Sequence, residues 1–330
     1  MKAPVRLPAL FFLTSSFLLA DTDFTIGVNS YRLVTTARTW DNAQVDAVAK
    51  GGNLVRIDSA AENTAVFNAI SGIVTTTASD GGGSRYAWIG GRETATEGSY
   101  AWAPDTATVF WSGGSPGSAQ NGLYQNWGRL ASPYGGPEPD NYNSQNRVAM
   151  AIAGWPNGAP SFYLIGNAGQ WNDLANADTL HYVIEWTPWQ NWRKTWFTGA
   201  SLTNDSVSGP TANPDNDGLS NLLEHAFGTN PTVSNSSPAS ESNGSIISLG
   251  APSVSITGGQ TKLIFARRKA FAAENLTYTA SFSGNLYNWT NATATPAVLA
   301  DNGTMQIVSL DFPQISGAPA RFARVLVSLP

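Results

Sequence analysis

The chain has no cysteine among its 330 residues, yet its N-terminus has the pattern of an export signal. Lys2 and Arg6 precede an apolar run over residues 7–19, and the small residue Ala20 comes just before Asp21. This pattern is typical of a secretory signal peptide over residues 1–20, because the run is too short to cross a bilayer comfortably. An exported chain without cysteine has no disulfide framework and no thiolate metal site. We therefore expect a mature protein that is secreted or held at the cell surface and is stabilised by apolar burial and by calcium.

The composition limits the classes of partner that the chain is expected to bind. Charged residues make up only 12% of the chain, against roughly 25% in average soluble domains, and Asn, Ser, Thr and Gly supply much of the polarity. The formal charge is −5 and no stripe of Lys and Arg occurs that would neutralise phosphates. No stretch after the leader approaches the ~20 apolar residues of a transmembrane helix. We expect neither a nucleic-acid partner nor a transmembrane segment in the mature chain.

Residues 21–187 form the first expected domain, which is dense in Trp and Gly. Two capping patterns predict helices over residues 40–50 and 59–70. The buried side of the first helix is expected to consist of Ala43, Ala47 and Val48. Strands and long loops rich in Gly, Pro and Asn follow the helices, so the expected fold class is α+β.

The amino-acid composition of the remaining chain changes twice. Residues 188–245 have the composition of a linker, interrupted by one helix pattern over residues 219–227. Residues 246–330 alternate apolar and polar segments between Gly, Asn and Pro turns, which predicts a small all-β, sandwich-like domain. Its expected strands cover residues 262–266, 276–282, 305–310 and 322–327.

Several short motifs follow one another through residues 30–187. They are Trp40 with Ala43, the strand 87–91, the aromatic pairs Tyr100/Trp102 and Tyr124/Trp127, the triplets 138–140 and 171–173, and the closing strand 182–186. Each motif is weak alone, but their shared order is specific. On this basis the segment resembles the C-type lectin-like domain family. The resemblance implies two helices, antiparallel strands and a long loop region.

Members of that family bind sugar through a calcium ion held by side-chain oxygens from two loops. Calcium takes six to eight hard oxygen ligands, and two vicinal sugar hydroxyls can complete its shell. By motif matching, sugar and metal are both bound by Glu138, Asp140, Asn172 and Asp173, and Gln145 is a further metal ligand. The resemblance also implies a cis bond between Glu138 and Pro139.

Two of these positions depart from the family pattern. The usual triplet ends in Asn where this chain has Asp140, and Gln145 stands near a position usually held by glutamate. The two exchanges cancel in charge, so three carboxylates still surround the ion. Calcium binding is therefore expected, while the family's sugar preferences do not carry over.

The family commonly carries two disulfides, which this chain lacks. The matching positions pair Ala47 with Ile184 and Arg147 with Asn176. Loss of a long-loop crosslink forgoes roughly 4–5 kcal/mol in the chain-entropy model. We expect aromatic burial to offset much of this loss, since each large aromatic side chain buries on the order of 150–250 Å².

A second metal signal lies in the linker. Positions 1, 3, 5, 6, 7, 9 and 12 of an EF-hand-type calcium loop are occupied by Asn213, Asp215, Asp217, Gly218, Leu219, Asn221 and Glu224. Leu219 would offer its carbonyl, and Glu224 would bind through both carboxylate oxygens. Residues 213–228 resemble the calcium-loop linkers of exported bacterial proteins, and residues 246–330 are similar to the C-terminal β domains that accompany them. We expect a structural Ca²⁺ ion that stiffens the junction; the alternative is a solvated acidic turn that caps a helix.

Enzyme motifs are weak in this chain. Residues 113–117 fit the GxSxG pattern of a nucleophile elbow, but Pro116 among Gly and Ser predicts a flexible loop instead of the required helix. Neither His181 nor His225 has a nucleophile beside it in a motif. The carboxylates of the two triplets could serve a glycosidase, but their placement suits ion ligation better.

The sequence therefore favours a binding protein with no enzymatic activity. We expect a secreted, calcium-dependent carbohydrate-binding protein whose partner is a glycan or glycoprotein. The alternative is an extracellular adhesin or scaffold with the same fold, which would bind protein ligands and lack a functional sugar site.

Overall fold

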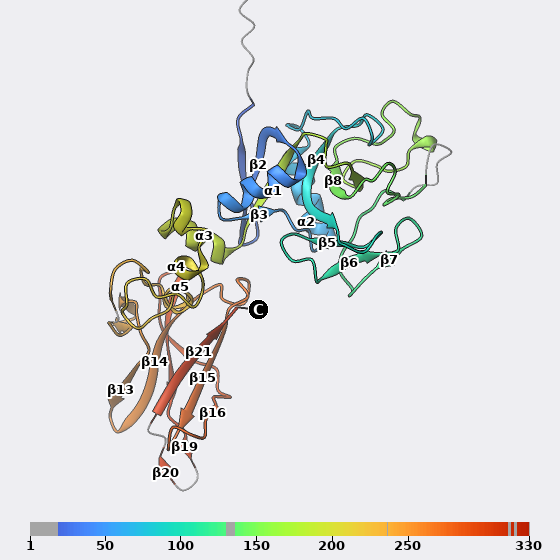
Figure 1. The fold of residues 1–330 in the computed structure, drawn as a ribbon. Helices are drawn as coiled ribbons and strands as arrows, with labels where there is room; N and C mark the ends of the chain where they lie inside the picture. Colours follow the sequence, from blue (N-terminus) through green and yellow to red (C-terminus); the bar gives the residue numbers. More distant parts are fainter. Residues whose placement is uncertain (1–18, 130–135, 236, 316–317, 320–321, 330) are drawn as a thin grey trace, which may run out of the picture.

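The computed structural model describes residues 19–129, 136–235, 237–315, 318–319 and 322–329. The expected signal peptide lies almost wholly outside these residues. The chain forms an N-terminal lobe (residues 19–187), a helical junction (188–235) and an elongated C-terminal lobe (237–329), as Figure 1 shows. Within the described part of the chain, no helix has the length and apolarity needed to cross a membrane.

A mixed sheet forms the frame of the N-terminal lobe. Its main path runs β1-β2-β10-β4-β5-β6-β7, while β3 pairs with β10 and β8 lies between β4 and β9. The strand bounds are β1 Thr22–Ile26, β2 Asn29–Arg38, β3 Asn53–Leu54, β4 Tyr86–Glu93, β5 Tyr100–Trp102, β6 Val109–Ser112, β7 Ser118–Ala119, β8 Arg147–Ala151, β9 Trp171–Leu174 and β10 Leu180–Trp186. Strand β10 pairs antiparallel with β2 and parallel with β4, so the end of the lobe returns beside its beginning.

Two helices complete this α+β lobe: α1 Trp40–Ala49 and α2 Ala60–Ile70. Both begin at the expected caps, because the side chains of Thr39 and Ser59 accept backbone N–H groups of the first turn. The expected burial of Ala43 and Ala47 is confirmed. The expectation for Val48 is wrong, since its side chain is 41% exposed. One residue corresponds to about 100° around a helix, so Val48 points away from the face that contains Ala47.

Aromatic side chains fill the centre of the lobe. Trp102, Phe110, Trp127 and Trp171 are buried and joined by a continuous set of ring contacts, with centroid separations from 4.7 to 6.2 Å. Contacts at these separations add to the energy of apolar burial. This packing accords with a lobe that is stable without crosslinks.

The positions that match the absent disulfides are connected in two other ways. Ala47 and Ile184 belong to the same buried apolar cluster. The second pair is bridged by Asp41: Arg147 Nε and Nη2 donate to Asp41 Oδ1 at 3.1 and 3.0 Å, and Asn176 Nδ2 donates to Asp41 Oδ2 at 2.9 Å. A polar bridge from α1 thus joins the two segments.

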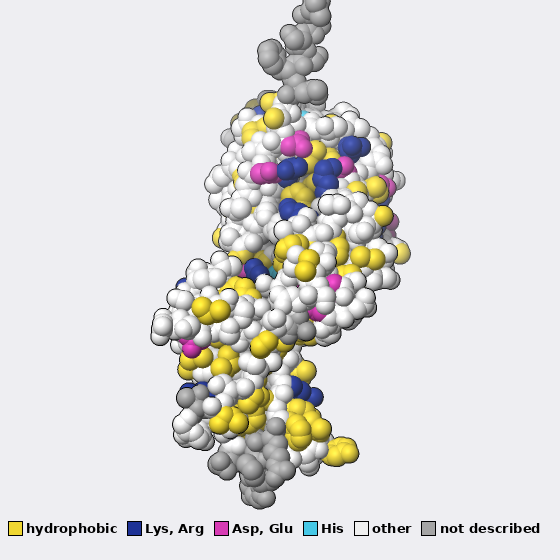
Figure 2. Space-filling view, turned by 90° about the vertical axis from the view of Figure 1, so that its left-hand side faces the viewer, with side chains coloured by type: hydrophobic (Ala, Val, Ile, Leu, Met, Phe, Trp, Pro, Cys, Tyr) yellow, Lys and Arg dark blue, Asp and Glu magenta, His cyan; other side chains and the backbone are white. Residues whose placement is uncertain are grey.

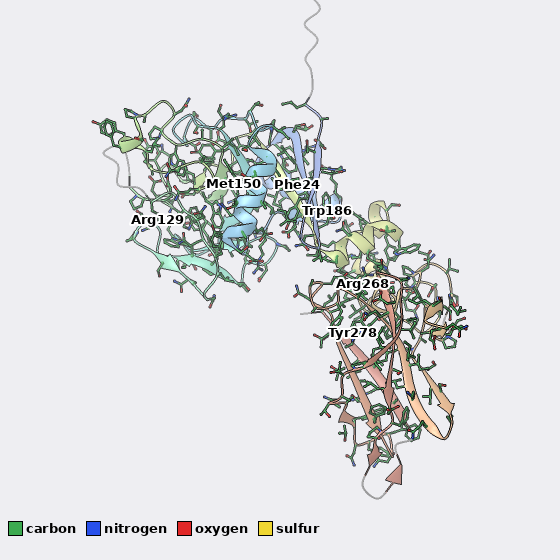
Figure 3. The ribbon with its side chains drawn as sticks, turned by 180° about the vertical axis from the view of Figure 1, so that it is seen from behind. Phe24, Arg129, Met150, Trp186, Arg268 and Tyr278 are labelled. Atoms are coloured by element: carbon green, nitrogen blue, oxygen red, sulfur yellow. The ribbon has the colours of Figure 1, made fainter. Side chains whose placement is uncertain are left out.

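The junction contains more helix than the sequence predicted. Its elements are α3 Pro188–Trp196, η2 Gly199–Ser201, α4 Asp205–Ser208 and α5 Asn221–Phe227. Helix α3 begins with a capping box in which Thr187 and Gln190 bind each other's backbone N–H groups. Trp186 marks the end of the N-terminal lobe beside this helix (Figure 3).

Two packed sheets form the C-terminal lobe, as the sequence predicted for its main strands. One has the order β13-β14-β18-β17 and the other β16-β15-β21, with two further hairpins, β11-β12 and β19-β20. The bounds are β11 Ser240–Ser242, β12 Ser245–Ser248, β13 Ser253–Thr257, β14 Gln260–Arg268, β15 Thr277–Ser283, β16 Thr290–Asn291, β17 Ala297–Asp301, β18 Met305–Asp311, β19 Gln314–Ile315, β20 Ala318–Pro319 and β21 Phe322–Ser328. Helix α5 belongs to this lobe's core, because Phe227 is buried in one cluster with Ala266 and Ile307.

Candidate functional site

Three carboxylates converge in the N-terminal lobe. Glu138 and Asp140 lie in the long loop between β7 and β8, while Asp173 lies on β9. The antiparallel pairing of β8 with β9 places Asp173 opposite Val148, close to the end of that loop. One ligand oxygen from each carboxylate lies within 4.8 Å of the others. The structure therefore brings together the three acidic residues that the sequence proposed as one metal site.

The carboxylate of Asp173 is fully buried and fixed by three donors. Tyr100 Oη donates to Asp173 Oδ2 at 2.8 Å, and the backbone N–H of Asn141 donates to the same oxygen at 3.0 Å. The backbone N–H of Asp140 donates to Asp173 Oδ1 at 3.2 Å. These bonds tie the long loop to β9 and hold Asp140 beside Asp173.

Glu138 is buried with one oxygen satisfied and one not. Trp155 Nε1 donates to Glu138 Oε1 at 3.0 Å, whereas Oε2 has no hydrogen-bond partner among the described residues. The bond between Glu138 and Pro139 is cis, as the resemblance implied. A buried carboxylate oxygen without a partner is costly, so Oε2 is suited to a cation.

The electrostatics of the site also favour a cation. The pKa of Glu138 is raised well above its ordinary value, first by burial and then by the charges of Asp173 and Asp140. Burial likewise raises the pKa of Asp173 to about 7, although the Tyr100 hydroxyl opposes the rise. A divalent ion would reverse both effects, because it compensates the desolvated charges.

The two amide side chains proposed as ligands have different surroundings. Asn172 Nδ2 donates to Tyr86 Oη at 3.1 Å, which leaves its buried Oδ1 without a hydrogen-bond partner among the described residues. Gln145 is buried too, but its Nε2 donates to the backbone carbonyl of Asp80 at 3.2 Å. Asn172 thus offers a free oxygen to a ligand. The side chain of Gln145 is fixed by its bond to the Asp80 carbonyl, and its role as a ligand stays a prediction.

Sequence reasoning missed Tyr142, which lies two residues after Asp140. Its side chain is 62% exposed, and its backbone N–H donates to Asp140 Oδ1 at 2.9 Å. An exposed aromatic ring is able to pack against the apolar face of a ligand. Its position next to the acidic triplet was the available signal.

The second set of predicted metal ligands lies in the junction loop. Ligand oxygens of Asp215, Asp217 and Glu224 lie within 4.8 Å of one another. Gly218 has a φ of 94°, a conformation that side-chain-bearing residues rarely adopt, so the sharp turn expected at the sixth loop position is confirmed. Asn213 Oδ1, Asp215 Oδ2 and Glu224 Oε2 are buried without hydrogen-bond partners in the described structure.

Glu224 is the most perturbed group of this loop. Its side chain is fully buried on α5, and Thr229 Oγ1 donates to its Oε1 at 3.3 Å. Burial, then Asp215 and Asp217, raise its pKa to about 8. The alternative of a solvated acidic turn fits poorly with these buried, unpartnered oxygens.

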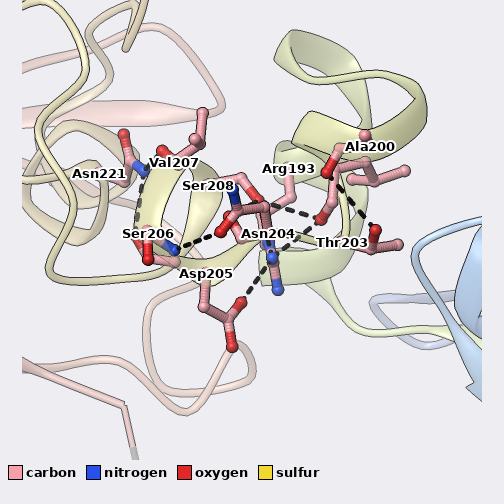
Figure 4. Close-up of polar contacts among 11 residues, drawn as sticks. Arg193, Ala200, Thr203, Asn204, Asp205, Ser206, Val207, Ser208 and Asn221 are labelled. Carbon is pink, nitrogen blue, oxygen red and sulfur yellow. Dashed lines mark hydrogen bonds and ion pairs between the residues drawn. The ribbon is translucent and has the colours of Figure 1, made fainter.

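Asn221 connects this loop to the rest of the junction. Its Nδ2 donates to the backbone carbonyls of Val207 and Gly209, both at 2.9 Å, which leaves its buried Oδ1 without a partner among the described residues. Figure 4 shows the continuation of the network, in which Arg193 Nη2 on α3 binds Ser208 Oγ at 2.7 Å and Asp205 Oδ1 at 2.8 Å. A ligand at the loop would therefore act on α4 and α3 as well.

A cavity of about 620 Å³ lies where the lobes meet. Glu185 of β10 contributes to its lining and accepts bonds from Asn29 Nδ2 at 2.7 Å, the Arg56 backbone N–H at 3.0 Å and Tyr31 Oη at 3.3 Å. Burial and the nearby charge of Glu62 raise the pKa of Glu185 to about 7, against the effect of the Arg56 bond. No local sequence pattern indicated that this carboxylate would be buried.

The side chains considered for catalysis are either bonded to the backbone or buried. Ser115 Oγ, in the GxSxG match, donates to the carbonyl of Pro137 at 2.8 Å. His181 is buried on β10. His225 is buried against the stacked rings of Trp189 and Trp192, and burial lowers its pKa to about 3.

Comparison with known proteins gives a partial likeness. No family model matches the chain. Halomucin from Haloquadratum walsbyi is 26% identical over 169 residues, which cover 48% of this chain and only 1% of halomucin's own length.

Similar solved structures cover about half of the chain. C-type lectin CEL-I from Cucumaria echinata is 24% identical and covers 49% of this chain and 93% of its own, with a TM-score of 0.32. The carbohydrate-recognition domain of the mouse scavenger receptor C-type lectin is 18% identical, with 50% and 92% covered and a TM-score of 0.32. A calcium-independent type II antifreeze protein is 21% identical, with 50% and 90% covered and a TM-score of 0.32.

Proposed function

We propose that this protein is exported and binds a glycan through a calcium ion held by Glu138, Asp140 and Asp173. The observation that carries the proposal is the convergence of three carboxylates, two of them buried, with Glu138 Oε2 left unpartnered. Calcium prefers such hard oxygen donors and accepts six to eight of them. Asn172 Oδ1 would add a neutral ligand to the three acidic ones.

The exposed edge of the site would receive the sugar. Asp140 is partly exposed, whereas Glu138 and Asp173 are buried, so an ion held among them keeps one side toward solvent. Vicinal hydroxyls could complete its shell there, and the ring of Tyr142 could pack against the sugar. The motif resemblance supports this use of the site.

The junction loop would hold a second, structural Ca²⁺ ion. Its ligands would be Asn213, Asp215, Asp217 and Glu224, with the carbonyl of Leu219 and with Asn221. Buried oxygens without partners support this assignment. This ion would stabilise the junction and take no part in sugar recognition.

We propose binding without catalysis. The paired carboxylates of glycosidases lie roughly 5–9.5 Å apart to accommodate a sugar ring or a water. Here three carboxylates converge instead of two, and Glu138 Oε2 is buried without a partner among the described residues, which suits a single ion better. A protein-binding scaffold remains the competing function and is separated from a lectin by the experiment below.

Calorimetry and a glycan array on the mature chain test the proposal. Wild type should bind two calcium ions, and Asp173→Asn and Glu224→Gln should each bind one. Only Asp173→Asn should lose glycan binding, and chelator should abolish glycan binding by wild type. Asp105→Asn, which alters an exposed carboxylate of the same lobe, should behave as wild type. Equal glycan binding by wild type and Asp173→Asn would contradict the lectin function, and ligand capture that resists both chelator and free sugar would favour the scaffold.

A further inference from the structure

Asparagine-linked glycosylation motifs are confined to one part of the chain. Of the twelve asparagines after residue 203, seven lie in N-x-S/T motifs with no proline at x: Asn204, Asn235, Asn243, Asn275, Asn288, Asn291 and Asn302. None of the fifteen asparagines before residue 204 does. About one residue in five after residue 203 is Ser or Thr, so chance predicts only two or three such motifs there.

The structure exposes the asparagine of each motif. All seven asparagines are solvent-exposed, and most lie in turns or next to strand ends. Asn243 occupies the turn between β11 and β12, and Asn302 the turn between β17 and β18. Asn243 and Asn275 have φ values of 50° and 58°, which are typical of turns. A glycan attached to asparagine is bulky and must project into solvent in the folded protein, so this placement is required for modification.

Their amide nitrogens are also free in the described structure. Asn204, Asn235, Asn291 and Asn302 accept hydrogen bonds through Oδ1, and no bond donated by Nδ2 is recorded for any of the seven. By contrast, Nδ2 is a donor for eight of the fifteen asparagines before residue 204. The same holds for Asn221, which follows residue 203 but has no motif. Substitution at Nδ2 would therefore break no recorded contact at the seven positions.

Apolar side chains are exposed beside several of these positions. Tyr287 is 89% exposed next to Asn288, and Ile247 is 66% exposed near Asn243. Figure 2 shows hydrophobic side chains spread over the C-terminal lobe with few charges among them. Large exposed apolar groups in a weakly charged lobe favour aggregation unless something covers them. A bulky hydrophilic group on a neighbouring asparagine would cover them.

We propose that the C-terminal half of this protein carries N-linked glycans on these seven asparagines. The donor is a lipid-linked oligosaccharide phosphate or diphosphate of the export membrane. Nδ2 forms a bond to the anomeric carbon of the sugar and loses one proton, while the bond from that carbon to the phosphate oxygen breaks. The electron pair of that bond leaves with the lipid phosphate, so no oxidant or reductant is needed. The inference goes beyond the proposed function and shares with it only the export of the chain.

The segregation has a consequence for ligand binding. Glycans on the N-terminal lobe would compete with an external glycan for the site at Glu138, Asp140 and Asp173. With every motif located after residue 203, the sugars would instead cover the junction and the C-terminal lobe. The binding loops would remain uncovered.

Mass spectrometry of the protein exported by its native cells tests the inference. An amidase that releases N-linked glycans, used in heavy-oxygen water, converts each occupied asparagine to a labelled aspartate. We expect labels among the seven motifs and at none of the fifteen asparagines before residue 204. Unmodified asparagine at all seven positions of the exported protein, or sugar attached to Ser and Thr alone, would overturn the inference. Neither result bears on calcium-dependent sugar binding, which is measured separately.

Matched substitutions confirm the dependence on the motif at each site found occupied. For Asn288 the pair is Thr290→Ala, which removes the motif, and Thr290→Ser, which keeps it. For Asn302 the pair is Thr304→Ala and Thr304→Ser. Each alanine variant should lose the mass of one glycan per chain, and each serine variant should keep it. Retention of the glycan in an alanine variant would contradict the assignment. If one alanine variant fails to fold, the other turn provides an independent test.

Discussion

Replacement of Glu224 by glutamine should stabilise the calcium-free protein and remove its response to calcium. Glu224 is fully buried on α5, its Oε2 has no recorded partner, and Asp215 and Asp217 face it within the loop. Burial and these two charges raise its pKa to about 8 when no cation is present. Glutamine has nearly the same shape but cannot ionise.

The magnitude follows from proton linkage. A carboxyl whose pKa is about 8 in the folded state and 4.5 in the unfolded state binds its proton more tightly when folded, so stability falls as pH rises from 4.5 through 8. With one pKa unit equivalent to about 1.4 kcal/mol, the loss at pH 8 is about 4 kcal/mol. Calcium at a thousandfold excess over its dissociation constant would add about 4 kcal/mol to wild type. Glu224→Gln lacks the bidentate ligand and should gain little.

Thermal unfolding at pH 8, followed with chelator and with calcium, measures both effects. In chelator, Glu224→Gln should unfold at a temperature higher than wild type, by on the order of 10 °C. At pH 5 this difference should nearly vanish, because the carboxyl is then protonated in the folded state. Glu241→Gln on β11 is the control and should match wild type in both conditions. A variant that is less stable than wild type in chelator at pH 8, or that responds to calcium as wild type does, would refute the reasoning.

Three further predictions concern the N-terminal lobe. Glu185→Gln should reduce the pH dependence of stability. The raised folded-state pKa of about 7 makes Glu185 cost wild type up to about 3 kcal/mol as pH rises from 4.5 to 7, so urea unfolding of the variant should show a slope smaller by this amount, and equal slopes would contradict the assignment. Asp41→Ala should lower the free energy of unfolding by roughly 1–2 kcal/mol, since it removes the bridge between Arg147 and Asn176; an unchanged urea midpoint would show that the bridge contributes nothing. Tyr142→Ala should weaken sugar binding about tenfold and leave calcium affinity unchanged, as measured by calorimetric titration. A parallel loss of calcium affinity would instead indicate that the backbone of this loop is a ligand of the ion.

The sequence by itself determined the features that depend on near neighbours. Thr39 and Ser59 cap their helices because a capping side chain needs only N–H groups two or three residues ahead. The junction loop assembles Asp215, Asp217 and Glu224 for a similar reason, since all its ligands fall within twelve residues. The four predicted strands of the C-terminal lobe, which correspond to β14, β15, β18 and β21, follow from local alternation of apolar and polar residues. Helix α3 was missed because residues 188–245 were interpreted as a linker and the capping box at Thr187 and Gln190 was not recognised.

Only the tertiary structure decided which groups distant in the chain come into contact and how deeply each is buried. The pairing of β8 with β9 brings Asp173 to Glu138 and Asp140, more than thirty residues earlier in the chain. The motif resemblance named these residues together, but spacing along the chain could not show that Glu138 Oε2 lacks a partner or that the pKa of Asp173 rises to about 7. Desolvation depends on every segment packed around a group, including Trp155 and Tyr100, and not on its sequence neighbours. For the same reason the burial of Glu185 could not be predicted from the sequence, because its partners come from β2 and from the segment after β3.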